Sequence, residues 1–417
     1  DVQWLSFQTQ LTFRRAKSGG GEPTVSVWEI ARVTNGSDPS GGPAFNRFVD
    51  IAQDLGVPRT GDQSVDRLCR SPTVATVATV ATDVGTRSGG QPGTASKYAY
   101  VLVLMGMTPT TRESGKYTKY DRYAVGACMM AGSISHHGGT VMENGDTADI
   151  VCMYSGTFDD SVMELLGHFF DKVVKVEEIA RPTVTSIKKT RFRDRYLDWL
   201  DSSFTKINAL TLTDYEKILF LDADMLCLKN PSGAFSYDTP AGVVSSAESL
   251  DPGKEIPAMT IKKSLTDYGS YGVGGFAYLL TPSREKYDES INILDRFTKE
   301  RPYNTSEIVK QRYALSGNPV VAIGPDELFM TLLYPKWYYL GAEYGTAGWK
   351  RTEETIIIHF VTMKPWDEIE KKGEPVYADF ELWYKFTSMY VDKFPTLRDL
   401  ILSGDRGEEI LRRIHSS

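Results

Sequence analysis

Two aspartates one residue apart, Asp222 and Asp224, directly follow an apolar run of strand length at residues 217–221. Carboxylate oxygens are the ligands that hard divalent cations prefer. Two aspartates at positions i and i+2 of an extended chain can both reach one ion. The pair therefore predicts a cation site, although two aspartates after a strand can also cap a solvated turn.

A second apolar run, residues 355–358, leads into His359, and Lys364 follows five residues later, next to a proline and a tryptophan. An imidazole can complete a metal site begun by two carboxylates, and a lysine can bind a phosphate whose charge the metal only partly neutralises. Taken alone, this segment could equally hold a core histidine and a surface lysine. Together with the aspartate pair it predicts a centre that binds a cation and a diphosphate.

Regular elements that could position these side chains begin at residue 97. Short apolar runs predict strands at 98–105, 149–154, 173–176 and 217–221, and amphipathic stretches predict helices at 123–133, 162–169 and 204–212. Asp159 and Asp160 are candidate N-caps of the second helix. This alternation predicts a mostly parallel sheet with helices on both faces, and ligands of such sheets bind at the carboxyl ends of the strands. Further helices, expected at 379–386 and within 397–414, would pack on the outside.

Residues 1–96 differ in amino-acid composition from the rest of the chain. They contain several glycine-rich stretches and a three-residue repeat at 73–82, and their positive and negative charges balance. Turn-forming residues are too frequent there for a compact core. We therefore expect an irregular N-terminal extension or arm at 1–96, with homo-oligomer or assembly contacts among its possible roles, a catalytic α/β domain at 97–370 and a C-terminal helical extension at 371–417.

The composition of the 417 residues narrows the range of partners. Lysines and arginines number 47 and acidic residues 54, for a net charge of −7, so no general attraction for nucleic acid is expected. No run reaches the roughly 18 apolar residues that span a bilayer. Four cysteines without a CxxC pair indicate neither a disulfide framework nor a thiolate zinc site, and they suit a cytoplasmic protein or a viral particle.

Residues 101–366, about two thirds of the chain, resemble the glycogenin-like glycosyltransferases, which are retaining transferases of family eight with a GT-A fold. The matching motifs occur in the expected order. They are YAVGA from Tyr123, the strand-helix-strand at 149–176, Thr205-Lys206, FLDAD at 220–224, YGVGGFAY at 271–278, Pro325-Asp326-Glu327 and the segment from His359 to Trp366. The fold implied is a Rossmann-like mixed sheet flanked by helices.

The resemblance also implies roles for individual residues. Asp222, Asp224 and His359 would bind Mn²⁺, with Mg²⁺ as a possible substitute, and Lys364 and Lys206 would contact the phosphates of a UDP-sugar donor. The remaining donor contacts would come from Leu104, Tyr123, Ala223, Gly274 and Gly275, with Arg193 and Arg195 as further candidates. Asp326, Glu327 and Lys206 would lie at the reaction centre. Asp326 would act there either as a nucleophile or as a hydrogen-bond acceptor for sugar hydroxyls.

The chain departs from the family pattern around the expected sugar site. Glu327 replaces the usual glutamine, Gly272 replaces an asparagine, Thr362 replaces a glycine and Ile323 replaces an acidic residue. These changes spare the predicted metal and diphosphate ligands. They leave open which sugar is carried.

The leading hypothesis is a retaining transferase that moves a hexose from a UDP-sugar to a hydroxyl of a glycan, a protein or a small molecule. Metal and lysines would stabilise the UDP leaving group. One alternative is a catalytically inactive GT-A module with a structural or assembly role, which the altered sugar site would suit. Another is a phosphatase of the haloacid dehalogenase type, whose first strand also ends in two aspartates. No Asp-Asp pair follows downstream, which disfavours the phosphatase.

Overall fold

The computed structural model describes residues 96–106, 117–185, 199–244, 247, 249–267, 272–315, 323–371 and 373–417. The predicted N-terminal extension with its repeat at 73–82, Cys69, and the candidate donor contacts Arg193 and Arg195 lie outside these residues. The proposed division into three domains remains a prediction.

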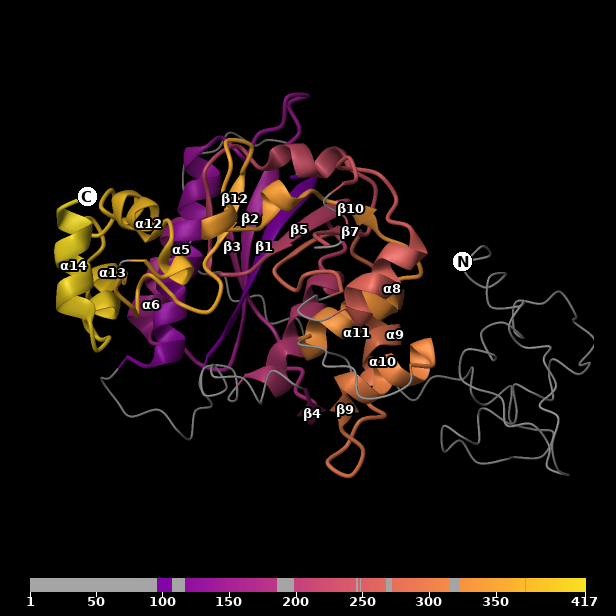
Figure 1. Ribbon diagram of the computed structural model, residues 1–417. Helices are drawn as coiled ribbons and strands as arrows, with labels where there is room; N and C mark the ends of the chain where they lie inside the picture. Colours follow the sequence, from indigo (N-terminus) through magenta and orange to yellow (C-terminus); the bar gives the residue numbers. More distant parts are fainter. Residues whose placement is uncertain are drawn as a thin grey trace, which may run out of the picture. The chain divides into compact units, whose positions relative to one another are not determined.

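A seven-stranded mixed sheet forms the centre of the fold, with strand order β10-β7-β8-β5-β1-β2-β3 (Figure 1). Its strands are β1 (Tyr98–Met105), β2 (Ala148–Ser155), β3 (Lys172–Lys175), β5 (Lys217–Leu221), β7 (Ala241–Gly242), β8 (Ala277–Leu280) and β10 (Tyr338–Tyr339). β1 pairs in parallel with β2 and β5, whereas β8 runs antiparallel to β5 and β7. The four predicted strands are confirmed. β8 was not predicted, because the glycines before it obscure the strand pattern.

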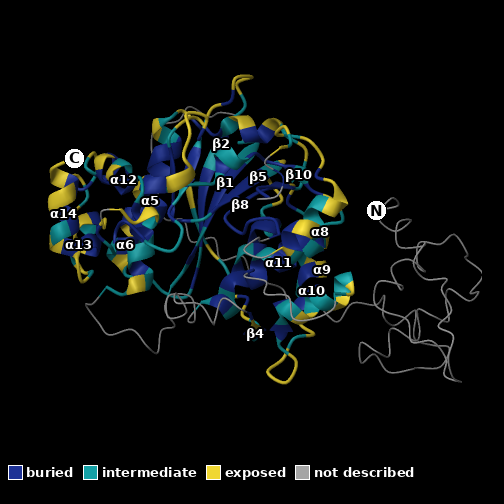
Figure 2. Ribbon diagram, viewed as in Figure 1, coloured by how far each residue is buried: buried dark blue, intermediate teal, exposed yellow. Residues whose placement is uncertain are grey.

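Side chains alternate between the two faces of the sheet and feed two hydrophobic clusters. On β1, Tyr100, Leu102 and Leu104 join one cluster, and Ala99 and Val101 join the other. The helices of the first cluster are α5 (Lys119–His136) and α6 (Asp160–Phe169), capped at its N-terminus by Asp159. Those of the second are η2 (Leu200–Thr211), a 3₁₀ helix, α8 (Ala258–Thr266), α9 (Arg284–Leu294), α10 (Thr305–Tyr313) and α11 (Pro325–Leu333). Helices thus cover both faces, as predicted, and the central strands β1, β2, β5 and β8 between them are largely buried (Figure 2).

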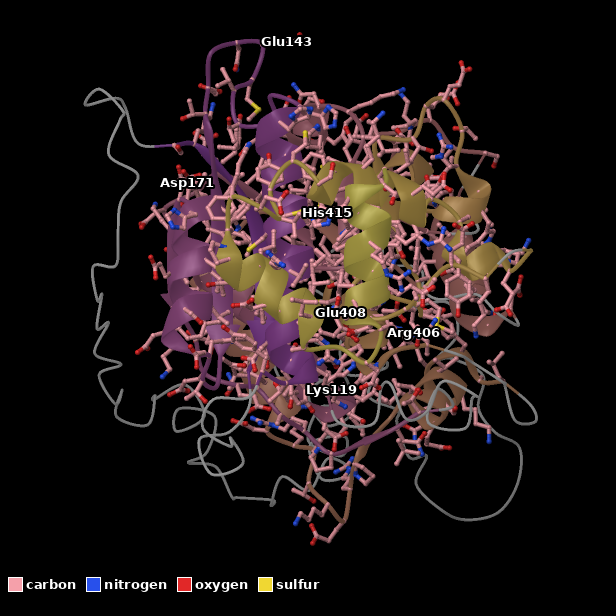
Figure 3. The ribbon with its side chains drawn as sticks, turned by 90° about the vertical axis from the view of Figure 1, so that its left-hand side faces the viewer. Lys119, Glu143, Asp171, Arg406, Glu408 and His415 are labelled. Atoms are coloured by element: carbon pink, nitrogen blue, oxygen red, sulfur yellow. The ribbon has the colours of Figure 1, made fainter. Side chains whose placement is uncertain are left out.

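The C-terminal segment is helical, as predicted, and packs on the outer side of α5 and α6. It contains α12 (Phe380–Thr387), α13 (Pro395–Leu402) and α14 (Gly407–His415). The charged residues Glu408 and His415 of α14 lie on the outer surface of this layer (Figure 3). Trp383 of α12 faces Trp366 with ring centroids 6.0 Å apart, so these helices share a core with the domain that precedes them.

A second, three-stranded sheet joins the two segments that carry the predicted metal ligands. It contains β11 (Thr346–Ala347), β12 (Ile357–His359) and β6 (Met225–Cys227). β12 pairs antiparallel with β6 and places His359 opposite Met225. Because Met225 follows Asp224 directly, this pairing brings the imidazole beside the aspartate pair.

Shorter elements complete the description. They are the paired strands β4 (Thr183–Val184) and β9 (Tyr303–Asn304), and the 3₁₀ turns η3 (Ser232–Ser236), η5 (Ala342–Tyr344), η6 (Gly348–Lys350) and η7 (Pro375–Tyr377). Within the described ranges, no helix combines the length and the apolar character needed to cross a bilayer.

Candidate active site

Three side chains that are far apart in the sequence converge at the ends of β5 and β12. Asp222, Asp224 and His359 each place one potential ligand atom within 4.8 Å of those of the other two. The main chain fixes this arrangement, because the amide of Asp222 donates to the carbonyl of Phe276 (2.9 Å) and the amide of Phe360 donates to the carbonyl of Asp224 (2.9 Å). Two carboxylates and an imidazole form a mixed oxygen and nitrogen donor set, which suits Mn²⁺ or Mg²⁺.

The two oxygens of Asp224 face different partners. Oδ1 lies 3.4 Å from Nε2 of His359, and Oδ2 forms an ion pair with the ammonium of Lys364. Lys364 also donates to the carbonyl of Phe360 (2.7 Å), and its side chain is only 9% exposed. Burial would raise the pKa of Asp224, but the charges of Lys364 and His359 outweigh this effect and hold the pKa well below its usual range. Asp224 therefore remains a carboxylate at any physiological pH.

Lys206 links the three candidate metal ligands to the predicted reaction centre. Its ammonium lies 3.0 Å from Oδ1 of Asp222 and 2.9 Å from Oδ2 of Asp326, and it donates to the carbonyl of Gly275 at 2.9 Å. Burial alone would lower the pKa of Lys206, but the two carboxylates raise it well above its ordinary value. Burial raises the pKa of Asp222 in spite of this ion pair, and the nearby charge of Asp224 acts in the same direction. Lys206 thus supplies a buried positive charge between two acidic groups.

Asp326 and Glu327 open helix α11, with Pro325 at its first position. The carboxylate of Glu327 accepts from two main-chain amides, that of Gly324 at 2.7 Å and that of Gly275 at 3.2 Å. Burial, followed by the charge of Asp326, raises the pKa of Glu327 to about 7, although both amide hydrogen bonds oppose the shift. A glutamine in this position has a single acceptor oxygen and could not accept from both amides in the same way. The departure from the family pattern therefore fits the local main chain.

A cavity of about 990 Å³ surrounds these groups. The predicted site residues that line it are Leu104, Tyr123, Lys206, Asp222, Ala223, Asp224, Gly275, Asp326, Glu327, His359 and Lys364. Gly274 is buried but is not among the lining residues, so a direct contact of Gly274 with a donor is not supported. A Cβ atom on Gly275 would come within 2.9 Å of Oδ2 of Asp326 and 2.7 Å of Cγ of Glu327, so a glycine is needed there to seat α11.

Several lining residues were not anticipated from the sequence. Phe276 lies with its ring centroid 4.8 Å from that of His359 and covers one side of the imidazole. Lys119 and Tyr120 begin α5, and Glu343 and Trp349 come from the segment between β10 and β12. Phe276 directly follows the predicted donor contacts Gly274 and Gly275, and this position could have identified it as a candidate site residue. The segment from 341 to 355 carries no motif that would have identified its residues.

The packing beneath the aspartate pair is tight. A Cβ atom on Gly126 of α5 would lie 2.3 Å from Cη2 of Trp366 and 2.5 Å from the carbonyl oxygen of Ala223. Ala223 stands between the two aspartates, so helix α5 and Trp366 together support the loop that presents them. This support explains why the segment after Lys364 ends in a tryptophan.

Comparison with known proteins identifies relatives at low identity. No protein-family model matches the chain. It is 22% identical over 278 residues to the uncharacterized protein R707 of Acanthamoeba polyphaga mimivirus, a match that covers 66% of this chain and 84% of that protein. It is 23% identical over 285 residues to inositol phosphorylceramide glucuronosyltransferase 1 of Arabidopsis thaliana, covering 65% of this chain and 43% of the plant protein. It is 28% identical over 121 residues to glycogenin-1 of Mus musculus, covering 29% and 33% of the two chains.

The matches with the plant and mouse proteins thus span less than half of the length of either relative. Among solved structures, the galactosyltransferase LgtC in complex with donor and acceptor sugar analogues superposes with a TM-score of 0.39 and 11% identity, covering 72% of this chain and 94% of that chain. The motif order and the named sequence relatives agree with each other. The chain is thus similar in sequence to glycogenin-like glycosyltransferases, and its mixed sheet flanked by helices agrees with the GT-A type fold that the resemblance predicts.

Proposed function

We propose that the protein is a retaining glycosyltransferase that transfers a hexose from a UDP-sugar to a hydroxyl acceptor with the help of Mn²⁺. The observation that supports this most directly is the convergence of Asp222, Asp224 and His359, whose ligand atoms lie within 4.8 Å of one another at the end of the central strand. Two lysines flank the three side chains. This combination matches the charge distribution of a diphosphate with a divalent cation.

Asp222, Asp224 and His359 would hold the cation. Oδ1 of Asp224 faces the imidazole while Oδ2 faces Lys364, so metal ligation by Oδ1 leaves the lysine contact available. When bound, the cation would act as a Lewis acid that stabilises negative charge on the diphosphate. Mg²⁺ prefers oxygen ligands more strongly than Mn²⁺ does, and the imidazole therefore favours Mn²⁺.

The reaction breaks the bond between the anomeric carbon and a diphosphate oxygen, which leaves with the electron pair. A hydroxyl oxygen of the acceptor forms the new bond, and its proton passes to the departing diphosphate. Lys364 contributes positive charge where this negative charge develops, in a buried position where the interaction is strong. Retention follows from attack on the face that the diphosphate leaves, or from two successive displacements through a carboxylate.

Asp326 is the carboxylate best placed for a role at the sugar. It lines the cavity, its side chain is 8% exposed, and Lys206 fixes it in position at 2.9 Å. From this position it can accept hydrogen bonds from sugar hydroxyls or stabilise positive charge at the anomeric carbon. Mass spectrometry of the protein after incubation with donor alone separates these roles, since only a nucleophile forms a glycosylated peptide that contains residue 326.

The test of the metal site uses calorimetry and transfer assays. Wild-type protein should bind UDP with Mn²⁺ and far more weakly without it, and Asp224→Asn or His359→Ala should lower transfer at least 100-fold while the far-UV circular dichroism is retained. Matched controls are Asp392→Asn and His415→Ala, which alter an exposed histidine-aspartate pair 3.2 Å apart in the C-terminal segment. Transfer that survives both site substitutions would refute the assigned metal ligands.

The same measurements separate the alternatives. An inactive module that keeps its donor site would bind UDP with Mn²⁺ and release no sugar. A phosphatase would hydrolyse simple phosphate esters and show no preference for a UDP-sugar. Hydrolysis of a UDP-sugar with retained anomeric configuration, read by NMR, would support the transferase.

A further inference from the structure

Trp349 lines the cavity although a large part of its side chain is exposed to solvent. It lines the cavity, and 43% of its surface is exposed to solvent. The other large hydrophobic side chains that are exposed in the described part of the chain are Val141, Val184, Met259 and Met389, and none of these lines the cavity. A partly exposed indole beside a cavity offers an aromatic face on which a ligand can pack.

The main chain places Trp349 close to the three candidate metal ligands. β11 ends at Ala347, which pairs with His359 of β12. Trp349 follows Ala347 by two residues, so its main chain lies close to that of His359. A ligand that rests on Trp349 is therefore held next to the place where the metal would hold the donor. The three-stranded sheet fixes this proximity without any loop movement.

Turn η6, which carries Trp349, also contacts the segment that leads into α12. A Cβ atom on Gly348 would lie 2.5 Å from the carbonyl oxygen of Ala378, so the turn packs directly against the segment that leads into α12. Arg351 then forms an ion pair with Asp379, with Nε and Oδ1 3.0 Å apart. Contacts on both sides of Trp349 thus hold the turn in place. A turn that is already ordered loses less conformational entropy when a ligand binds to it.

Glu343 supplies the polar part of the same region. It lines the cavity with its side chain partly buried, and its main-chain oxygen accepts from the amide of Ile356 at 2.9 Å. No lysine or arginine in the described ranges forms an ion pair with its carboxylate. Burial raises the pKa of Glu343, as expected for a carboxylate that lacks a cationic partner. Hydroxyl groups of a ligand could donate to its oxygens.

We propose that Trp349 and Glu343 form the acceptor subsite of this enzyme and that they bind a neutral sugar ring. A pyranose has one face of C–H groups, which packs on an aromatic plane, and an edge of hydroxyls, which donate to a carboxylate. This subsite rests on the proposed transferase function and specifies its acceptor as the end of a neutral glycan.

The same observations argue against other acceptors. A lipid chain needs a continuous apolar patch, and the exposed hydrophobic residues of the described ranges are scattered over different elements. An acidic sugar that packed on Trp349 would bring its own carboxylate close to that of Glu343, which lines the same cavity. A neutral sugar avoids both costs.

Saturation-transfer difference NMR tests the subsite without requiring turnover. Maltose, lactose and cellobiose are added in turn to the full chain with UDP and Mg²⁺, which avoids the line broadening that Mn²⁺ causes. Saturation is expected on the C–H protons of one sugar face for at least one disaccharide. Trp349→Ala should weaken binding about tenfold, Trp349→Phe should stay within about threefold of wild type, and Glu343→Gln should fall between them.

Met259→Ala is the matched control, because Met259 is 67% exposed and lies outside the cavity. The inference is overturned if no disaccharide shows saturation with the wild-type protein, or if Trp349→Ala binds as wild type does. It is also overturned if a tyrosine- and serine-containing peptide, and no disaccharide, shows saturation that depends on Trp349. Failure of the proposed function is a different result, since it appears as loss of metal-dependent UDP binding in calorimetry.

Discussion

Replacing Lys206 by methionine should strongly destabilise the α/β domain. The ammonium lies 3.0 Å from Asp222 and 2.9 Å from Asp326, whose side chain is 8% exposed. At an effective dielectric constant of about 20, each contact is worth roughly 5 to 6 kcal/mol of Coulomb energy, most of it offset by desolvation of the charges. Removing one member of a buried pair typically costs about 3–5 kcal/mol, because the remaining charge is uncompensated. We expect the free energy of unfolding to fall by that amount at neutral pH.

Urea unfolding at pH 7.5, followed by circular dichroism, measures this loss. The double variant Lys206→Met with Asp326→Asn should recover at least half of it, since the more buried of the two unpaired carboxylates is then gone. In the single variant the unpaired carboxylates acquire a raised folded pKa, so the deficit should shrink as pH falls toward 5. Lys286→Met is the matched control, because Lys286 pairs with Glu289 at 2.6 Å on the exposed face of a helix and should cost less than about 1 kcal/mol. A loss no larger than that of the control would refute the reasoning.

Two further predictions concern packing and protonation. Gly126→Ala should lower the free energy of unfolding in urea by about 1–3 kcal/mol and weaken metal-dependent UDP binding, because the new methyl group would overlap Trp366. Gly167→Ala in α6, where nothing lies within 4 Å, should be neutral or stabilising in the same urea assay. The raised pKa of Glu327, about 7, means that the folded state holds this proton more tightly than the unfolded state does. Its contribution to stability therefore falls by about 3 kcal/mol as pH rises from below 4.5, the usual pKa, to above 7. Urea unfolding at several pH values should show this slope in the wild type and its absence in Glu327→Gln, and equal slopes would contradict the assignment.

The sequence predicted the elements that are built from continuous apolar runs. The strands at 98–105 and 217–221 have the predicted bounds, since contiguous buried residues leave little ambiguity. The helix at 204–212 is instead the 3₁₀ helix η2, because the ion pairs of Lys206 and packing on the sheet decide its geometry rather than helix propensity. The two-residue strands β7 and β10 have no pattern of their own and form only because their neighbours pair with them.

Of the site, the sequence predicted the residue types but not their partners. The three predicted metal ligands converge because β12 pairs with β6, which begins directly after the aspartate pair. The bridge from Lys206 to Asp326 joins positions more than a hundred residues apart, so local spacing contains no information about it. Trp349 was missed for a related reason: its importance comes from the pairing of Ala347 with His359, which only the tertiary structure shows.

The ion pair between Lys364 and Asp224 has a thermodynamic consequence for ligand binding. A cation that arrives alone must share Asp224 with an ammonium already seated there, and the two positive charges repel each other. A diphosphate offers that ammonium a second anion and so lowers the cost of admitting the metal. If the proposed function is right, nucleotide and metal would therefore favour each other's binding, and by reciprocity the gain in affinity would be the same whichever of them arrives first.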